Sequence, residues 1–153
     1  MKVREIMTTE PRTCAPGATL ATAASLMWDG DCGILPIVED GKLVGVVTDR
    51  DMFIALATRN RLASQMRVRE VATQTVATCE PEDDVHVALA TMKNTRVRRL
   101  PVVGFAGTVL GVISMNDILL AAGPNEHVRD EEVVDTLQAI CAHHGPVPQI
   151  VAA

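Results

Sequence analysis

The chain has 153 residues, of which 48% are hydrophobic, and its formal net charge at pH 7 is −5. A chain of this size and composition forms one compact domain, and no apolar run approaches the roughly 20 residues that a membrane span requires. The chain has only three aromatic residues and a negative charge. We therefore expect no nucleic-acid binding, which needs a basic face or a base-stacking platform. The short apolar runs likewise predict no membrane insertion.

The N-terminus and the cysteines indicate the compartment. Met1 leads directly into charged residues without an apolar leader, so we expect a cytoplasmic protein. The four cysteines form no Cys-x-x-Cys pair and no Cys/His cluster at zinc spacing; they are Cys14, Cys32, Cys79 and Cys141. This pattern predicts reduced, mostly buried thiols and no metal site, and it leaves any redox role of the thiols open.

The first half of the chain predicts the order strand, helix, strand, strand, helix. The expected elements are a strand at 12–14, a helix at 19–28, strands at 34–38 and 43–47 around a tight turn, and a helix at 49–58. Helical spacing places one apolar face on the first helix, formed by Leu20, Ala23, Ala24 and Met27. The same argument predicts that Met52, Phe53 and Leu56 of the second helix face inward.

The second half repeats this order and adds a terminal helix. The expected elements are a strand at 76–78, a helix at 83–93 with Val85, Leu89 and Met92 on its inner face, strands at 100–103 and 109–113, and a helix at 115–122. Asn125 can cap the last helix, which Gly145-Pro146 ends. Its apolar stripe consists of Val133, Val134, Leu137, Ile140 and Cys141. This stripe either closes over the domain's own core or pairs with a second chain.

The two halves are an internal duplication. A shift of 65 positions places Val3-Arg4-Glu5 on Val68-Arg69-Glu70 and Leu35-Pro36 on Leu100-Pro101. After one inserted residue, Gly45-Val46 falls on Gly111-Val112. We expect two copies at residues 1–60 and 68–123, a linker at 61–67, and a terminal helix with its tail at 124–153. Two such copies should pack on each other about a pseudo-twofold axis.

Each copy ends its last strand in a hydroxyl followed three residues later by a carboxylate. The pairs are Thr48 with Asp51 and Ser114 with Asp117. At a strand-to-helix junction the hydroxyl and the helix N-terminus can hold a phosphate, and the carboxylate can accept hydrogen bonds from the two hydroxyls of a ribose. The same pattern is also a capping box that only satisfies the helix's own N–H groups.

These repeated motifs resemble a tandem pair of CBS domains, the Bateman module. The resemblance covers about residues 3–122 and departs modestly from the family's pattern, as with Ala72 where the second copy would carry Met. It implies an α+β fold of two β-α-β-β-α repeats whose inter-copy clefts bind AMP, ADP, ATP or S-adenosylmethionine, with no other cofactor. The adenine would lie against the first short strand of the opposite copy. The family's habit of pairing through helical faces, together with the spare stripe of the terminal helix, implies a homodimer.

The distribution of arginines indicates which of the two clefts is the better candidate for binding a nucleotide. Arg96, Arg98 and Arg99 stand just before Leu100-Pro101, where members of the resembled family that bind nucleotides often place a basic pair. We therefore expect the main site at Ser114, Asp117, Arg98 and Arg99, with backbone from residues 7–13, including Thr13, against the base. The second candidate combines Thr48 and Asp51 with residues 75–78, including Thr78. The other interpretation of the arginines is a solvated strand end.

The sequence does not predict an enzyme. His86 is expected on an exposed helix side, and the other histidines, at 127, 143 and 144, are expected on the terminal helix. These side chains do not converge with a nucleophile, and no Walker loop is present. We expect a regulatory module that senses an adenosyl ligand and signals to an unknown protein partner. The alternative is a CBS-like dimerisation or protein-interaction module without a nucleotide ligand.

Overall fold

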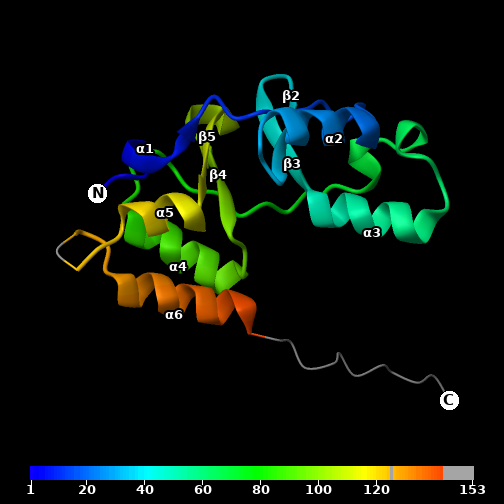
Figure 1. Ribbon diagram of the computed structural model, residues 1–153. Coiled ribbons are helices and arrows are strands. Elements are labelled where there is room, and N and C mark those ends of the chain that lie inside the picture. Colours follow the sequence, from blue (N-terminus) through cyan, green and yellow to red (C-terminus); the bar gives the residue numbers. More distant parts are fainter. Residues whose placement is uncertain (125, 143–153) are drawn as a thin grey trace, which may run out of the picture.

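The structure is a computed structural model that describes residues 1–124 and 126–142. It has two lobes side by side, each combining an antiparallel hairpin with helices (Figure 1). The first lobe contains α2 (Leu20–Asp29), β2 (Ile34–Glu39), β3 (Lys42–Thr48) and α3 (Asp49–Arg59). The second contains α4 (Val85–Thr95), β4 (Arg99–Val103), β5 (Val109–Ser114) and α5 (Met115–Ala121). The predicted α+β fold of two repeats with a terminal helix is confirmed.

The two hairpins are built alike. β2 pairs with β3, and β4 with β5, and both pairings shift register at equivalent places, between Ile37 and Val38 and between Val102 and Val103. The turn between β2 and β3 has positive φ at Asp40 (50°) and Gly41 (77°). A two-residue turn of type I′ requires this conformation at both central positions, and Asp-Gly adopts it readily. The tight turn expected here is therefore confirmed.

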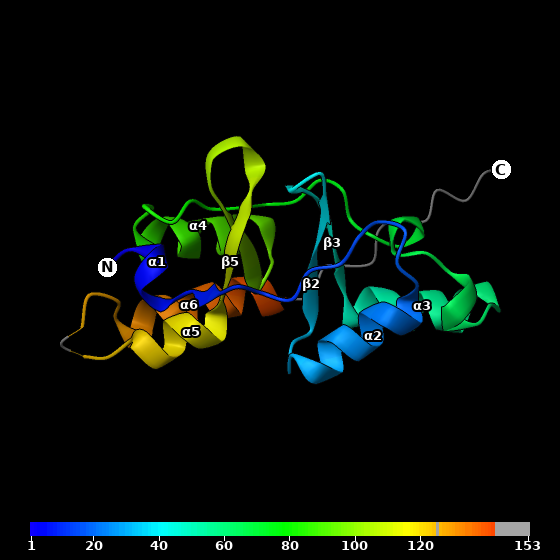
Figure 2. The same ribbon diagram turned by 90° about the horizontal axis from the view of Figure 1, so that it is seen from above.

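The first residues of each copy cross to the lobe of the other copy. β1 (Thr8–Thr9) joins the sheet of the second lobe through β5, and Thr73 bridges Val46 of the first lobe. Figure 2 shows the N-terminal chain starting beside the second lobe and then crossing to the first. A Cβ atom at Gly111 would lie 2.7 Å from Thr8 O, and one at Gly45 would lie 2.9 Å from Thr73 O. The repeated glycine is needed because the incoming strand approaches so closely.

Short helical turns secure the exchange. In α1 (Val3–Ile6), Val3 is fully buried in the second lobe and donates a hydrogen bond from its N–H to Asp83 O at 3.0 Å. Its equivalent, Val68, begins η2 (Val68–Glu70), is fully buried in the first lobe and donates to Ala18 O at 2.8 Å. These matched contacts relate the two lobes by a pseudo-twofold axis. The turn η1 (Ala63–Gln65) lies just before the second of them.

The strands predicted at 12–14 and 76–78 are wrong as continuous elements. A single residue is bridged to the neighbouring hairpin in each copy, both bridges being parallel: Cys14 to Ile37 within the first segment, and Cys79 to Val102 one residue after the second. Pro16 and Pro81 follow two residues later. Because proline lacks the N–H that would extend a ladder, pairing stops after one bridge.

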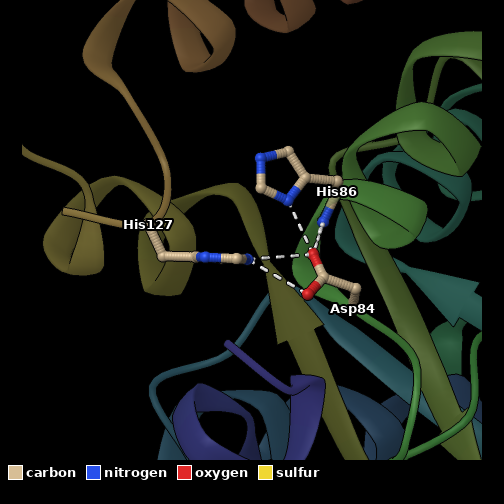
Figure 3. A group of neighbouring side chains, drawn as sticks. All are labelled: Asp84, His86 and His127. Atoms are coloured by element: carbon tan, nitrogen blue, oxygen red, sulfur yellow. Dashed lines mark hydrogen bonds and ion pairs between the residues drawn. The ribbon is translucent and has the colours of Figure 1, made fainter.

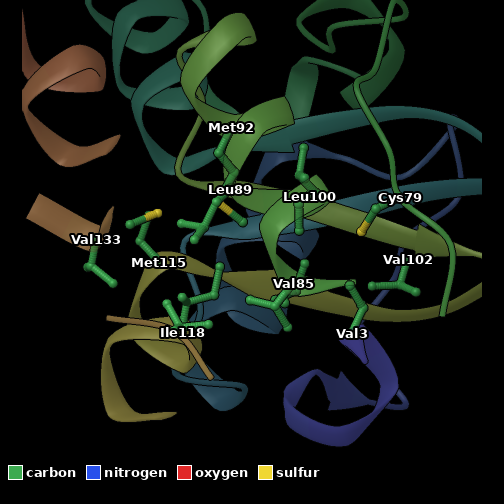
Figure 4. Close-up of a cluster of buried hydrophobic side chains, with 13 residues drawn as sticks. Val3, Cys79, Val85, Leu89, Met92, Leu100, Val102, Met115, Ile118 and Val133 are labelled. Carbon is green, nitrogen blue, oxygen red and sulfur yellow. The ribbon is translucent and has the colours of Figure 1, made fainter. Parts of the chain in front are cut away.

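Each lobe has its own core, and the core of the second is drawn in Figure 4. The predicted inner face of α4 is confirmed, since Val85, Leu89 and Met92 are buried. On α2, Leu20, Ala23 and Met27 are buried, whereas Ala24 is exposed. The prediction for α3 is wrong in part: Met52 is buried, but Phe53 is 72% exposed and Leu56 is 42% exposed. The buried stripe is Met52 with Ala55, one helical turn apart, so the face that α3 turns inward is narrower than the sequence pattern suggested.

The terminal helix α6 (Asp130–Cys141) packs against the second lobe. Val133 is fully buried there, and Leu137 and Ile140 contact the same core. Of the two uses predicted for this stripe, the structure shows the first, so the stripe no longer supports a homodimer. The helix begins at Asp130 with Arg129 at the cap position, which leaves His127 ahead of the helix and corrects its predicted place. Asn125, His143, His144 and Gly145-Pro146 lie outside the described residues.

Within the described ranges, none of the helices combines the length and hydropathy needed to cross a bilayer.

Candidate ligand-binding clefts

The hydroxyl and carboxylate of the first motif form a capping box. Thr48 is the cap of α3, and its N–H and Oγ1 donate to Asp51 Oδ2 at 3.0 and 2.7 Å. Asp51 N donates back to Thr48 Oγ1 at 3.2 Å. Only Oδ2 of the carboxylate is used among the described residues. The Oδ1 atom therefore keeps its acceptor capacity, and the capping and ligand-binding interpretations are compatible here.

The second motif repeats this geometry closely. Ser114 N and Oγ both donate to Asp117 Oδ2 at 2.7 Å, and Asp117 N donates to Ser114 Oγ at 3.3 Å. The two motifs are thus equivalent in their local hydrogen bonding. A difference between the two sites must come from the residues around them.

A cleft of about 400 Å³ opens in front of Thr48 and Asp51. Its walls come from the first hairpin and the first turn of α3, from residues 73–77 at the start of the second copy, and from the residues at the start of β4. The charged side chains that line it are Asp49, Asp51, Arg50, Arg96, Arg98 and Arg99. Four guanidinium groups face two carboxylates, so we call this the arginine cleft.

A second cleft, of about 360 Å³, opens in front of Ser114 and Asp117. The charged side chains that line it are Glu10, Asp31, Asp117, Arg12 and Arg99. Carboxylates outnumber guanidinium groups here, so we call it the acidic cleft. Arg99 is half-buried and lines both clefts.

Arg98 lies in the cleft opposite to the one predicted. The sequence suggested that it accompanies Ser114 because both belong to the second copy, but its side chain lines the arginine cleft with Thr48. Its backbone explains the difference, since Arg98 O accepts a hydrogen bond from Met115 N at 2.9 Å. The carbonyl therefore faces its own copy's junction while the side chain crosses to the other one. The equivalent residue of the first copy, Gly33, accepts from Asp49 N at 3.3 Å in the same way.

The predicted threonines line neither main cleft. Thr13 is exposed and absent from the walls of the acidic cleft, which are formed instead by its neighbours Glu10, Pro11 and Arg12. Thr78 faces a separate cavity of about 250 Å³, and residues 75–77 line the arginine cleft in its place. The expected exchange of segments between the copies is thus present in both clefts and falls largely within the predicted ranges 7–13 and 75–78, but Thr13 and Thr78 at the ends of these ranges do not line the clefts.

Sequence reasoning also missed Arg50 and Arg12, which line the arginine and acidic clefts respectively. Arg50 stands between Thr48 and Asp51 in the motif itself, so its position carried a usable signal. Arg12 had no such signal, because it approaches Ser114 only through the exchange of the N-terminal segment.

The duplicated, exchanged architecture can be compared with known families. The profile of the CBS domain matches the chain twice, over residues 3–58 and 68–123. The chain belongs to the CBS domain family. A similar protein is the CBS domain-containing protein YhcV of Bacillus subtilis, with 32% identity over 124 residues, which cover 81% of this chain and 87% of YhcV. The inosine-5′-monophosphate dehydrogenase of Thermoplasma acidophilum is 30% identical over 131 residues, 85% of this chain, but the match spans only 24% of that enzyme.

Solved CBS pairs share the fold. The CBS domain pair of protein MJ0100, in complex with 5′-methylthioadenosine and S-adenosyl-L-methionine, superposes with a TM-score of 0.71 and 28% identity. The superposition covers 77% of this chain and 92% of the MJ0100 pair. The two clefts of this chain are therefore the inter-copy clefts of a CBS pair.

Proposed function

We propose that this CBS pair is a regulatory module that binds an adenosine phosphate in the arginine cleft and signals its occupancy to a partner protein. The observation that carries the proposal is that four arginines line the cleft in front of the junction formed by Thr48 and α3. Anions are favoured at a helix N-terminus, and arginine matches the geometry of phosphate oxygens. The MJ0100 pair, a relative by fold and sequence, is described with adenosyl ligands, which supports the ligand class.

The cleft offers a partner for each part of such a ligand. Phosphate would lie at the N-terminus of α3 near Arg50 and Arg98, and ribose hydroxyls would donate to Asp51 Oδ1. The adenine ring would contact Ile34 and Val46, which line the same cleft beside residues 73–77. Because the acidic cleft has an excess of carboxylates, we propose that it takes a less anionic compound such as S-adenosylmethionine, or none.

A thermal-shift screen tests this function. A ligand that binds only the native state stabilises it by about 2.7 kcal/mol at a hundredfold excess over its dissociation constant. We expect AMP, ADP or ATP to raise the melting temperature, and GTP to raise it less. Arg98→Ala should abolish most of the shift, whereas the matched change Arg12→Ala in the acidic cleft should preserve it. If none of these nucleotides and no S-adenosylmethionine stabilises the protein, the ligand-sensing proposal fails.

We infer further that two chains pair through the outer face of α2 and α3. Trp28 is 87% exposed there, and Phe53 and Leu56 line the same surface hollow. A contiguous apolar surface of this kind marks an interaction site. The resemblance to CBS pairs that associate through their helices supports a second copy of this chain as the occupant.

The second candidate function is protein interaction without a nucleotide. It is favoured by the capping boxes, since Thr48, Asp51, Ser114 and Asp117 all have structural partners without any ligand. Release of an ultraviolet-absorbing nucleotide on denaturing the purified protein, or its detection by native mass spectrometry, would favour ligand sensing over this candidate.

A further inference from the structure

Far from both clefts, three side chains of metal-binding type converge at the start of α4. Asp84 and His86 come from the first turn of this helix, and His127 comes from the segment that connects α5 to α6 (Figure 3). His86 Nδ1 lies 2.6 Å from Asp84 Oδ1, and His127 Nε2 lies 3.1 Å from Asp84 Oδ2. One ligand atom from each residue can be chosen so that all three lie within 4.8 Å of one another.

The second nitrogen of His86 has a partner of its own. His86 Nε2 lies 3.4 Å from Glu132 Oε1 in the first turn of α6. Histidines that bind metals commonly donate their other N–H to a carboxylate, which fixes the tautomer and the orientation of the ring. Glu132 therefore orients the ring of His86 so that Nδ1 faces Asp84.

Capping of α4 does not by itself require this cluster. Asp84 caps the helix by accepting from His86 N at 3.0 Å. In the first copy, the equivalent cap of α2 is Thr19, and the position equivalent to His86 is Ala21. The first copy thus caps the same helix without an imidazole, so the histidines of the second copy add something beyond the cap.

The charge and exposure of the cluster suit a cation that enters from solvent. Asp84 supplies the negative charge of the cluster, and each of its two carboxylate oxygens lies beside an imidazole nitrogen. The α-amino group of Met1 lies 3.5 Å from Asp84 Oδ2. The side chains of Asp84, His86 and His127 are about two-fifths exposed, at 37%, 40% and 45%, which leaves room for a water ligand.

We propose that Asp84, His86 and His127 form a zinc site, in which Asp84 Oδ, His86 Nδ1 and His127 Nε2 are the ligands and water completes the coordination. Two imidazoles and one carboxylate are a common protein ligand set for zinc. Zinc binds the unprotonated nitrogen of an imidazole, so binding releases any proton that His86 Nδ1 or His127 Nε2 carries. The ligands come from the start of α4 and from the α5–α6 connection. The zinc ion would therefore stabilise the packing of α6 against the second copy.

Calorimetric titration of the full chain with zinc chloride tests the site, after treatment with a chelator. We expect one saturable site per chain. Loss of a residue that orients a metal ligand typically weakens metal binding by about 10–100-fold, and we expect a loss of this size for Glu132→Gln. His127→Ala removes a ligand itself, so it should weaken zinc binding by at least as much. The matched control is Asp135→Ala, which breaks the 2.5 Å ion pair between Lys93 of α4 and Asp135 of α6 but removes no ligand.

A cobalt titration separates this site from the cysteines. Cobalt bound by imidazole and carboxylate absorbs in the visible range without the near-ultraviolet band of a thiolate ligand. We expect the visible band in the wild type and in Asp135→Ala, and its loss in His127→Ala with an unchanged circular dichroism spectrum. The proposal is overturned if zinc does not bind saturably, if His127→Ala binds it as tightly as the wild type, or if cobalt shows thiolate absorption.

Discussion

The two copies carry the same motif with the same internal hydrogen bonds, yet the clefts in front of them differ in charge. The difference comes from the residues that lead into β2 and β4, where Asp31 and Gly33 of the first copy correspond to Arg96 and Arg98 of the second. Because these residues face the opposite copy's motif, the second copy's arginines charge the first copy's site. The charge of each cleft is thus set largely by residues of the copy that does not supply its motif.

The helical faces of the two copies differ as well. On the first copy, Trp28 and Phe53 are exposed between α2 and α3. On the second copy, α6 covers the corresponding helices, and Val133 is fully buried beneath it. A single added helix thus covers one face and leaves the other exposed.

The largest loss of stability is expected from a substitution where α6 covers the second copy. Val133→Asp places an unpaired charge in a fully buried position, and an uncompensated buried charge costs about 3–5 kcal/mol. Val134→Asp, one residue along at a position that is 51% exposed, should change the free energy of unfolding by no more than about 0.5 kcal/mol. Urea denaturation of both variants measures the difference. Equal stabilities would show that α6 is not packed as described.

The exposed face of the first copy should control association. Trp28→Asp, alone or with Phe53→Asp, should convert the proposed dimer to a monomer of 16.4 kDa while leaving the melting temperature of the isolated chain nearly unchanged. Loss of one central aromatic contact typically costs an interface at least about 2 kcal/mol, or more than tenfold in its dissociation constant. Size-exclusion chromatography with light scattering gives the mass directly. A wild-type protein that is already monomeric at micromolar concentration would contradict the pairing.

The smallest effect is expected on the reactivity of the cysteines, one of which, Cys32, lines the acidic cleft. Burial raises the pKa of the Cys14 thiol to about 11 and that of Cys79 to about 12, so neither should react with iodoacetamide near pH 8. Cys32 lines the acidic cleft, and Cys141 is exposed, so both should react. Saturation with ADP should change the rate at Cys32 by less than about twofold, because the nucleotide occupies the other cleft and the thiol remains accessible. Peptide mapping that shows strong protection of Cys32 would place the nucleotide in the acidic cleft.

Local chemistry was predictable from sequence, whereas contacts across the pseudo-twofold axis were not. The turn at Asp40-Gly41 and the capping boxes follow from short-range preferences, and both are observed. The side chain of Arg98 could not be placed, because that required knowing which way the backbone faces at the lobe interface. Phe53 was predicted to face inward because it is apolar and lies beside Met52. The spacing of apolar residues does not show how much of the surface of α3 the rest of the first lobe covers. Asp84 and His127 lie 43 residues apart, so no spacing rule joined them into a candidate metal site.

Paired calorimetric titrations of Asp51→Asn and Asp117→Asn with the best-binding nucleotide test whether the arginine cleft is the nucleotide site. Both variants keep an oxygen for the capping box, so each should lose only about 0.3–1 kcal/mol of stability. A charge-assisted hydrogen bond to ribose is worth about 1.5–3 kcal/mol, so Asp51→Asn should weaken binding by roughly tenfold or more. Asp117→Asn should bind the nucleotide as the wild type does. Equal affinities for the wild type and Asp51→Asn, or a loss confined to Asp117→Asn, would contradict the assignment.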